Sequence, residues 1–344
     1  MRRHAFVCAA VAGAVSGALR PRAASATGGL EIAQPSAPSP AIRILLAAGA
    51  AFPAATPIDD ESFEFAGHRY RGRFADVDLG DGRHGLVAEV PIEAYLYGVV
   101  GREMPPSWPA AALQAQAIIS RSYAMSRMRP ERPFDVVGSD SDQAYGDIAG
   151  ESVAARAAVD ATTRTILSFE GTLAEAVYSS CCGGHTASAA DAWNHDIPYL
   201  RSFVDPNCAG TPRYRWRSEV AWATFARAFS HELDGIGTVR SIALGQRDDS
   251  GRARTIAFTG ERSVDAVAAA AFRRALGTRV VRSTLLFAIG IAGNAASSTV
   301  TIDGGGNGHG VGMCQWGARG LALAGRPPAA ILAFYFPGAA LDRG

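Results

Sequence analysis

The order of hydrophobic and polar positions changes character near Val90. Before it, short β-like runs are separated by turn-rich pieces such as 78–82, a pattern typical of strands. After it, hydrophobic residues fall at helical spacing, which predicts helix over 91–128 with Pro91 in the first turn. The strands that we expect upstream are Ile42–Leu46, Phe63–Phe65, Tyr70–Phe74 and Gly85–Val90.

Farther along, helical and extended patterns mix without strict alternation. An apolar stripe of Trp222, Phe225, Phe229 and Leu233 predicts a helix over 218–233 with Ser218 as its cap. This mixture, without an internal repeat, indicates an α+β fold of helices and short-stranded sheets in two packed lobes. The other elements expected are helices at 151–163 and 263–276 (closed by Gly277), a hairpin at 165–180, strands at 238–245 and 254–259, a strand pair at 281–302, a glycine-rich loop and a terminal helix.

The first residues have the pattern of an export signal. A basic start, Met1–His4, precedes the apolar stretch Ala5–Leu19, and Ala24-Ser25-Ala26 offers a cleavage site. The apolar stretch is shorter than the roughly 20 residues that span a bilayer. We therefore predict a secretion signal at 1–26, a flexible leader at 27–41, and a mature chain without a transmembrane segment, exported to the periplasm or cell envelope.

Composition narrows the chemistry that the chain can perform. All 33 basic residues are arginine, so Schiff-base lysines, Ser-Lys dyads and Walker-type phosphate lysines are excluded. The formal net charge of +1 argues against a nucleic-acid partner. The chain contains neither G-x-S-x-G nor H-E-x-x-H, so serine-hydrolase and zincin mechanisms lack support. The catalytic groups that remain are carboxylate, histidine and thiol.

One carboxylate stands out on the helix that begins at Pro91. Ile92, Leu96, Val99 and Glu103 share one helical face, and Met104-Pro105-Pro106 ends the helix. Burial on an apolar face and the negative end of the helix dipole would both raise the pKa of Glu103, as a general acid requires. The alternative is an exposed glutamate at a helix end whose place on the stripe is accidental.

The same segment resembles the stage II sporulation protein D (SpoIID/LytB) family. Val90–Pro105, ending in Glu103-Met104-Pro105, is similar to the opening motif of that family, and further motifs follow in family order to the end of the chain. The match begins at about Tyr70. The later motifs are Ser107–Pro109, Leu113–Ala117, Arg121–Ala124, Asp142–Gly146, Tyr178–Thr186, Pro198–Leu200, Ser250–Arg252, Phe272-Arg273 with Leu276-Gly277, and Gly308–Ala318.

The resemblance implies a peptidoglycan lytic transglycosylase, which cuts the MurNAc–GlcNAc bond and leaves a 1,6-anhydroMurNAc end. It implies Glu103 as the catalytic acid of a glycan-binding cleft, since one carboxyl group can protonate the leaving oxygen and then take the proton of the sugar's own C6 hydroxyl. The expected partner is a glycan strand of peptidoglycan, and whether its stem peptides must first be stripped is open. The alternative is a non-catalytic glycan-binding module, or a modifier that activates a separate cell-wall amidase.

We expect an inserted segment to divide the catalytic lobe into two parts along the chain. We expect the catalytic lobe over 42–214, an inserted α/β lobe over 215–285, and the remainder of the catalytic lobe, with its Gly-His-Gly loop, over 286–344.

Candidate substrate-binding residues come from the motifs. His309, in the glycine-rich run 304–312, could contact a sugar or satisfy backbone groups, and Trp316 could be a sugar platform or a core residue. Arg121 could orient a carboxylate or the glycan, or be a solvated helical arginine. The resemblance alone places Gln143, Tyr145 and Ser180, whereas Gln315 could supply a hydrogen bond.

The cysteines after the signal permit two kinds of cross-link. Cys182 and Cys208 suggest a disulfide, which export favours. A zinc site built from Cys182, His185, Cys208 and Cys314 is the alternative, although adjacent Cys181 and Cys182 lack C-x-x-C spacing. A reactive Cys182–His185 pair is a further alternative, and no other cofactor is expected.

Overall fold

The computed structural model describes residues 40–139, 141–292 and 298–344. The predicted secretion signal at 1–26 and all but the last two residues of the leader at 27–41 lie outside the described residues. Two hydrophobic cores form within them, one from residues 42–208 together with 311–336, the other from residues 216–302. The mixture of helices and small sheets confirms the predicted α+β class. Among the described residues, no helix is long and apolar enough to cross a membrane.

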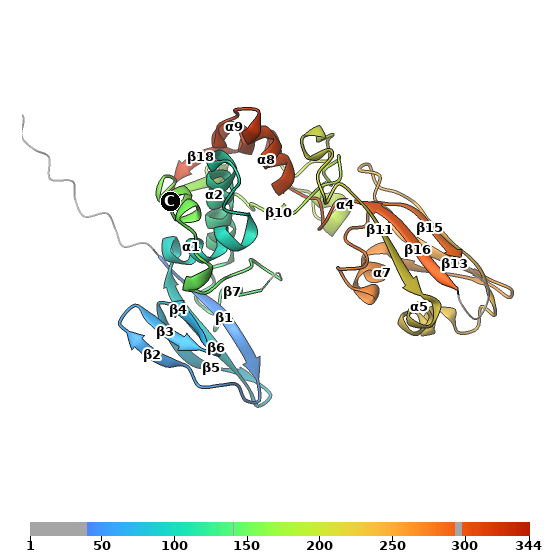
Figure 1. Cartoon of the computed structure of the whole chain (residues 1–344), viewed down its shortest axis with the longest axis horizontal. Coiled ribbons are helices and arrows are strands. Elements are labelled where there is room, and N and C mark those ends of the chain that lie inside the picture. Colours follow the sequence, from blue (N-terminus) through green and yellow to red (C-terminus); the bar gives the residue numbers. More distant parts are fainter. Residues whose placement is uncertain (1–39, 140, 293–297) are drawn as a thin grey trace, which may run out of the picture. The chain divides into compact units, whose positions relative to one another are not determined.

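A four-stranded sheet of order β5-β6-β1-β7 begins the first core (Figure 1). Its bounds are β1 (Ala41–Gly49), β5 (Arg73–Gly80), β6 (Arg83–Pro91) and β7 (Val136–Val137). β1 pairs antiparallel with β6 and parallel with β7. A three-stranded antiparallel sheet lies nearby, and its strands are β2 (Thr56–Asp59), β3 (Ser62–Phe65) and β4 (His68–Arg71).

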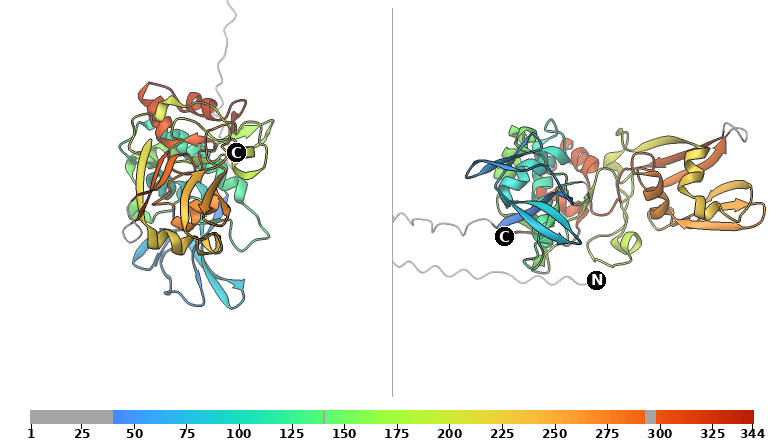
Figure 2. Two further views of the ribbon diagram at one scale, coloured as in Figure 1. Left: turned by 90° about the vertical axis from the view of Figure 1, so that its right-hand side faces the viewer. Right: turned by 90° about the horizontal axis from the view of Figure 1, so that it is seen from below.

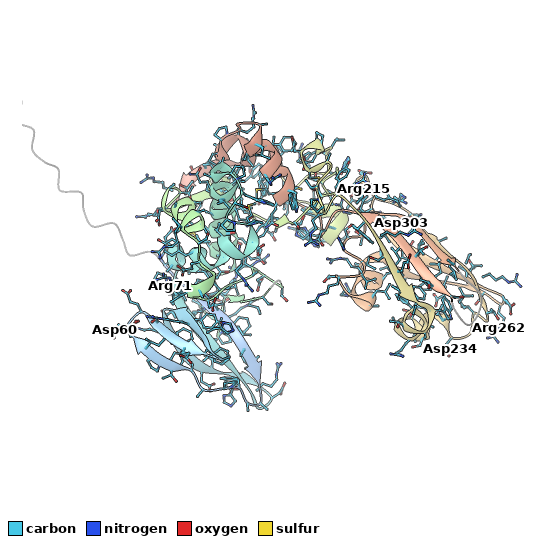
Figure 3. The ribbon with its side chains drawn as sticks, in the orientation of Figure 1. Asp60, Arg71, Arg215, Asp234, Arg262 and Asp303 are labelled. Carbon is cyan, nitrogen blue, oxygen red and sulfur yellow. The ribbon has the colours of Figure 1, made fainter. Side chains whose placement is uncertain are left out.

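An ion pair fastens this small sheet to the helical layer. Arg71 at the end of β4 donates from Nη2 to Glu151 Oε2 at 2.9 Å, and Figure 3 labels this arginine at the end of the strands nearest the helices. Glu151 follows the short 3₁₀ turn η1 (Ile148–Gly150) and precedes helix α3 (Val153–Asp160). The Glu151 side chain is almost fully buried, whereas the Arg71 side chain is 24% exposed, so the pair is partly buried.

Helix α2 (Ala110–Arg127) is the centre of the first core. α1 (Ile92–Glu103), α3, α8 (Gln315–Leu323), α9 (Pro328–Tyr335) and strand β8 (Thr165–Phe169) all contact it, which explains why most of its side chains are buried. β8 also pairs with β9 (Thr172–Leu173) and β18 (Ala340–Arg343). The remaining elements around this core are β10 (Tyr178–Ser179), α4 (Ala189–Trp193), η2 (Pro206–Cys208) and β17 (Met313–Cys314).

Two three-stranded antiparallel sheets build the second core, shown in yellow and orange in Figure 2. The first has the order β11-β16-β15 and the second β12-β13-β14, and strands β12 and β15 contact each other. Four phenylalanines, Phe225, Phe229, Phe258 and Phe272, pack together at its centre. The bounds are β11 (Arg215–Ala221), β12 (Val239–Leu244), β13 (Thr255–Gly260), β14 (Val264–Ala268), β15 (Leu286–Ala292), β16 (Thr299–Gly305), α5 (Trp222–Ala228), α6 (Ser230–Leu233) and α7 (Ala269–Leu276).

Two predicted helices in this region are wrong at their starts. Residues 215–221 form strand β11 because Trp216 and Val220 point inward while the chain pairs with β16, and Ser218 Oγ donates to Val280 O instead of capping a helix. Residues 264–268 likewise pair with β13 before α7 begins. Gly277 does end α7, with φ 83°, as the sequence predicts. The second core also continues past the predicted boundary at 285, because β15 and β16 complete the sheet of β11.

Candidate functional site

Helix α1 carries Glu103 to the edge of a cleft. Ile92, Leu96 and Val99 are buried, as their stripe predicts, and Pro105 follows the extended Met104 that ends the helix. Glu103, the last residue of α1, is half-buried, and its carboxyl group lines a cleft of about 1020 Å³. The apolar face therefore anchors the helix while its end reaches solvent.

Two amide groups orient the carboxyl group of Glu103. The backbone N–H of Ala144 donates to Oε1 at 2.9 Å, and the Gln315 side chain donates from Nε2 to Oε2 at 3.1 Å. Gln315 Nε2 also lies 3.3 Å from Oε1 of buried Gln116, which in turn donates to Ser120 Oγ. This chain of amides fixes the position of the carboxyl group from two directions.

His309 lines the cleft, but backbone groups occupy both of its ring nitrogens. Nε2 lies 2.8 Å from Tyr178 O, and the N–H of Val311 donates to Nδ1 at 3.1 Å. These partners fit a neutral ring protonated at Nε2, and burial lowers the pKa of His309 to about 4. Of the two roles that the sequence left open, the geometry favours the structural one.

The glycine-rich run allows the chain to pass close to a side chain at Gly310 and to other backbone at Gly312. Gly310 has φ 82°, and a Cβ there would lie 2.0 Å from Nη2 of Arg252. Gly312, at φ 69°, would place a Cβ 2.1 Å from Val177 O. Glycine is needed at these two positions for packing within the protein.

Positive charge dominates the rim of the cleft. Arg213, Arg279 and Arg282 form no ion pair with any described residue, while Arg127 pairs with Glu175 at 3.4 Å. Arg273 is partly buried and donates from Nε to Val281 O. The cleft thus presents guanidinium groups to a ligand that carries negative charge.

An exposed tryptophan at the cleft is one that sequence reasoning missed. Trp193, at the end of α4, lines the cleft, is 43% exposed, and packs on the His309 ring with centroids 5.2 Å apart. Trp316, the predicted platform, does not line the cleft and packs on Trp108 at 4.7 Å. The sequence signal for Trp193 is the run of polar residues that follows it. That signal alone does not show which tryptophan is exposed.

Three other predicted substrate contacts lie inside the protein, away from the cleft lining. Arg121 is 1% exposed and forms a two-bond ion pair with Glu93 at 2.6 and 2.9 Å. Gln143 is buried between the hydroxyls of Tyr95 and Tyr178. Tyr145 packs against Tyr95 with the rings tilted and their centroids 5.1 Å apart. None of the three lines the cleft. Their contacts therefore hold neighbouring elements of the protein together.

Strand β10 and the residue after it form a further part of the cleft wall. Ser180 lines the cleft as predicted, and Tyr178 and Ser179 beside it were not singled out from the sequence. Burial of the Tyr178 hydroxyl raises its pKa well above the ordinary value, and the nearby Glu103 raises it further. Tyr178 therefore stays protonated next to the Glu103 carboxyl group.

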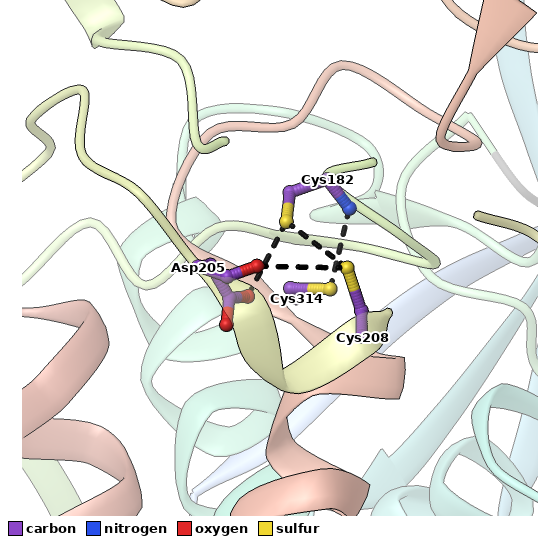
Figure 4. A group of neighbouring side chains, drawn as sticks. All are labelled: Cys182, Asp205, Cys208 and Cys314. Carbon is purple, nitrogen blue, oxygen red and sulfur yellow. Dashed lines mark hydrogen bonds between the residues drawn. The ribbon is translucent and has the colours of Figure 1, made fainter. Parts of the chain in front are cut away.

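The cysteines form a cluster beside this wall (Figure 4). The ligand atoms of Cys182, Asp205, Cys208 and Cys314 all lie within 4.8 Å of one another and are buried. The four described cysteines are free thiols, and Cys182 Sγ lies 3.5 Å from Cys208 Sγ, so the predicted disulfide stays a prediction. Asp205 occupies the place expected for His185, whose Nδ1 lies 2.9 Å from Thr186 O.

Comparison with known proteins places these features in a family context. Residues 80–169 match a family model described as stage II sporulation protein, SpoIID, and residues 194–312 match a domain of unknown function. The chain is 30% identical to the stage II sporulation protein D of Bacillus subtilis, over 73% of this chain and 74% of that protein. Glu103 and helices α1 to α3 lie inside the first match, and the second core lies inside the other.

Two further proteins are similar to this chain. The chain is 32% identical to an uncharacterized protein of Brachyspira hyodysenteriae, over 81% of this chain and 73% of that protein. It is 28% identical to the amidase enhancer of Bacillus subtilis, over 72% of this chain but only 40% of that protein. The chain therefore spans less than half the length of the amidase enhancer.

Proposed function

This chain belongs to the stage II sporulation protein D family, and from that premise we propose that it is a peptidoglycan lytic transglycosylase with Glu103 as its general acid and base. Its family and the amidase enhancer among its relatives connect it with the bacterial cell wall. The finer assignment rests on one observation: the Glu103 carboxyl group, oriented by two amides, lines an arginine-rimmed cleft.

The reaction needs one carboxyl group that can give a proton and take one. Glu103 protonates the oxygen between MurNAc and GlcNAc as the C1–O bond breaks. The resulting carboxylate then accepts the proton of the MurNAc C6 hydroxyl while O6 bonds to C1, so no water is added. The other carboxylates of the cleft are engaged elsewhere, since Asp142 accepts from Tyr123 and Val137 N, and Glu175 pairs with Arg127.

The cleft walls suit a glycan that carries carboxylates. On strands without stem peptides, MurNAc bears a free lactyl carboxylate, and guanidinium groups recognise carboxylates through paired hydrogen bonds. Arg279 and Arg282 are available for such contacts, and the exposed Trp193 offers a flat apolar surface to a sugar ring. These features support peptidoglycan as the substrate, reached by an exported protein in the cell envelope.

Mass spectrometry of digested peptidoglycan tests this function. We expect wild-type protein to release 1,6-anhydroMurNAc fragments and Glu103→Gln to release none, because the amide cannot transfer a proton. Glu175→Gln is the matched control, since Glu175 lines the same cleft and should leave product formation within a few-fold of wild type. Strands with and without stem peptides should be compared, because peptide removal is an open requirement.

The relative named amidase enhancer favours a second function, activation of a separate cell-wall amidase. Under this alternative, Glu103→Gln would stimulate a purified amidase as well as the wild type does, and neither protein would form anhydro products. Anhydro products from the wild type and from Glu175→Gln, but not from Glu103→Gln, would reject this alternative as the sole function.

A further inference from the structure

The cysteine cluster joins three distant segments of the chain. Cys182 follows β10, Asp205 and Cys208 belong to the turn η2, and Cys314 ends β17. Cys182 Sγ lies 3.3 Å from Asp205 Oδ2 and 3.5 Å from Cys208 Sγ (Figure 4). All four residues are at most 1% exposed. Their polar atoms therefore face one another and are shielded from solvent.

We propose that Cys182, Cys208, Cys314 and Asp205 bind one Zn²⁺ ion in a tetrahedral structural site. Zinc prefers thiolate and carboxylate ligands at about 2.3 and 2.1 Å, respectively, in closed four-coordinate sites. A tetrahedron with those bond lengths separates two sulfurs by about 3.8 Å and a sulfur from an oxygen by about 3.6 Å. The spacings of 3.5 and 3.3 Å are close to these values.

Two buried charges around the cluster lack an ordinary counter-charge. Asp205 is fully buried and forms no ion pair with any described residue. Arg252 is 3% exposed, also forms none, and its Nε has no hydrogen-bond partner. Burying isolated charges is unfavourable. A zinc ion compensates Asp205 directly, and the net negative zinc–thiolate centre compensates Arg252, whose Nη2 donates to Cys182 O at 2.8 Å.

The hydrogen bonds around the cluster also fit metal ligation. The backbone N–H groups of Cys182 and Gly317 donate to Cys314 Sγ at 3.2 and 3.3 Å, an environment that stabilises a thiolate. Asp205 accepts from Tyr335 Oη at 2.9 Å and from Asn207, which fixes the orientation of its carboxyl group. Such outer partners are typical of metal sites.

The site would also brace the candidate active site. Cys314 caps helix α8, and the next residue, Gln315, donates to Glu103. A metal ion that ties Cys314 to η2 and to the end of β10 therefore fixes the start of α8. The zinc is structural in this proposal and takes part in no reaction step.

Metal analysis of the purified full chain tests the proposal. We expect about one zinc per chain after expression in zinc-containing medium. Replacement by Co²⁺ should give the intense near-ultraviolet sulfur-to-cobalt band and the visible bands of a tetrahedral thiolate site. These two measurements use the wild type, so they hold even if a cysteine variant fails to fold. Absence of bound metal together with a Cys182–Cys208 disulfide in peptide maps would overturn the proposal.

Two variants test the ligand set. Cys208→Ser should lose most of the bound zinc and the cobalt–thiolate band. Cys181→Ser tests the limit of the ligand set, because Cys181 is equally buried and its thiol interacts with Cys208 and Cys314, yet it is not one of the four grouped ligands; it should keep both signals. Equal loss of zinc in the two variants would contradict the assigned ligands, and so would an Asp205→Asn variant with undiminished zinc affinity.

Discussion

The Gln315 side chain connects the Glu103 carboxyl group to the buried amide of Gln116. Gln315→Leu removes the donor to Oε2 while keeping a similar volume. We expect kcat to fall by up to about 100-fold with KM little changed, because Gln315 orients the proposed acid and misplacement of a catalytic group is costly. The pH profile of kcat should shift as well, which a purely structural role would not produce. Ser180→Ala, at another cleft position, is the control and should retain the wild-type profile.

The histidine of the cleft affects stability more than chemistry. Burial lowers the pKa of folded His309 to about 4, below the ordinary value of 6.5. The unfolded chain therefore binds the proton first as the pH falls, so stability is full above about 6.5 and decreases toward 4. The loss should reach at most about 3 kcal/mol. Urea unfolding across this range measures it, and His309→Gln should flatten the slope. Parallel profiles for both proteins would contradict this role.

The two tryptophans near the site should respond differently to substitution. Trp193→Ala removes an exposed ring from the cleft, so we expect the Kd for glycan fragments to rise about three- to tenfold with little change in unfolding free energy. Trp316→Ala removes packing against Trp108, so we expect lower stability. Isothermal titration with glycan fragments and urea unfolding separate the two effects. A stability loss without a binding loss in Trp193→Ala would rule out its role as a platform.

At the scale of elements, helix α1 was predictable because its information is local. The apolar stripe, Pro91 at the start and Pro105 after the end fix its span and put Glu103 at its end. Strand β11 was not predictable in the same way. Its alternation covers only Trp216 to Val220, and pairing with β16, more than 70 residues downstream, decides its conformation.

The ion pair between Arg121 and Glu93 holds three elements together. Arg121, on α2, binds Glu93 on α1 and donates to Thr165 O at the start of β8. Arg121→Met leaves Glu93 without its partner in a partly buried place, so we expect a loss of about 3 kcal/mol. Urea denaturation measures it, and the Glu93→Gln/Arg121→Met double variant should regain part of the loss. A single variant as stable as the wild type would contradict the role of this ion pair.

For the whole molecule, motif order predicted the candidate acid but not its surroundings. Arg279 and Trp193 line the cleft with Glu103, although they lie far apart along the chain. Arg121 and Gln143 belong to the same family motifs and are buried instead. A single sequence cannot separate these cases, because burial of a polar side chain depends on partners such as Glu93 and Tyr178, brought close only by folding.

The arginines of the second core should control glycan affinity through charge. Arg279 and Arg282 follow α7 and line the cleft, and the N–H of Gly308 donates to Arg282 O, which links this segment to the glycine-rich run. Reversing both charges, with Arg279→Glu and Arg282→Glu, should weaken binding of glycan strands stripped of stem peptides about tenfold or more at low salt, with a smaller effect at high salt because ions screen exposed charges. Titrations at two salt concentrations measure this.

The control for this charge reversal is Arg262→Glu, which changes the net charge at a position outside the cleft lining (Figure 3). It should leave affinity near the wild-type value, because exposed charges beyond a Debye length of about 10 Å contribute little. Equal weakening by Arg262→Glu would mean that net charge alone drives binding. Strands whose lactyl carboxylates are converted to amides provide the reciprocal test: they should bind wild type weakly and lose little further affinity in the reversed variant, since the groups that the arginines recognise are gone.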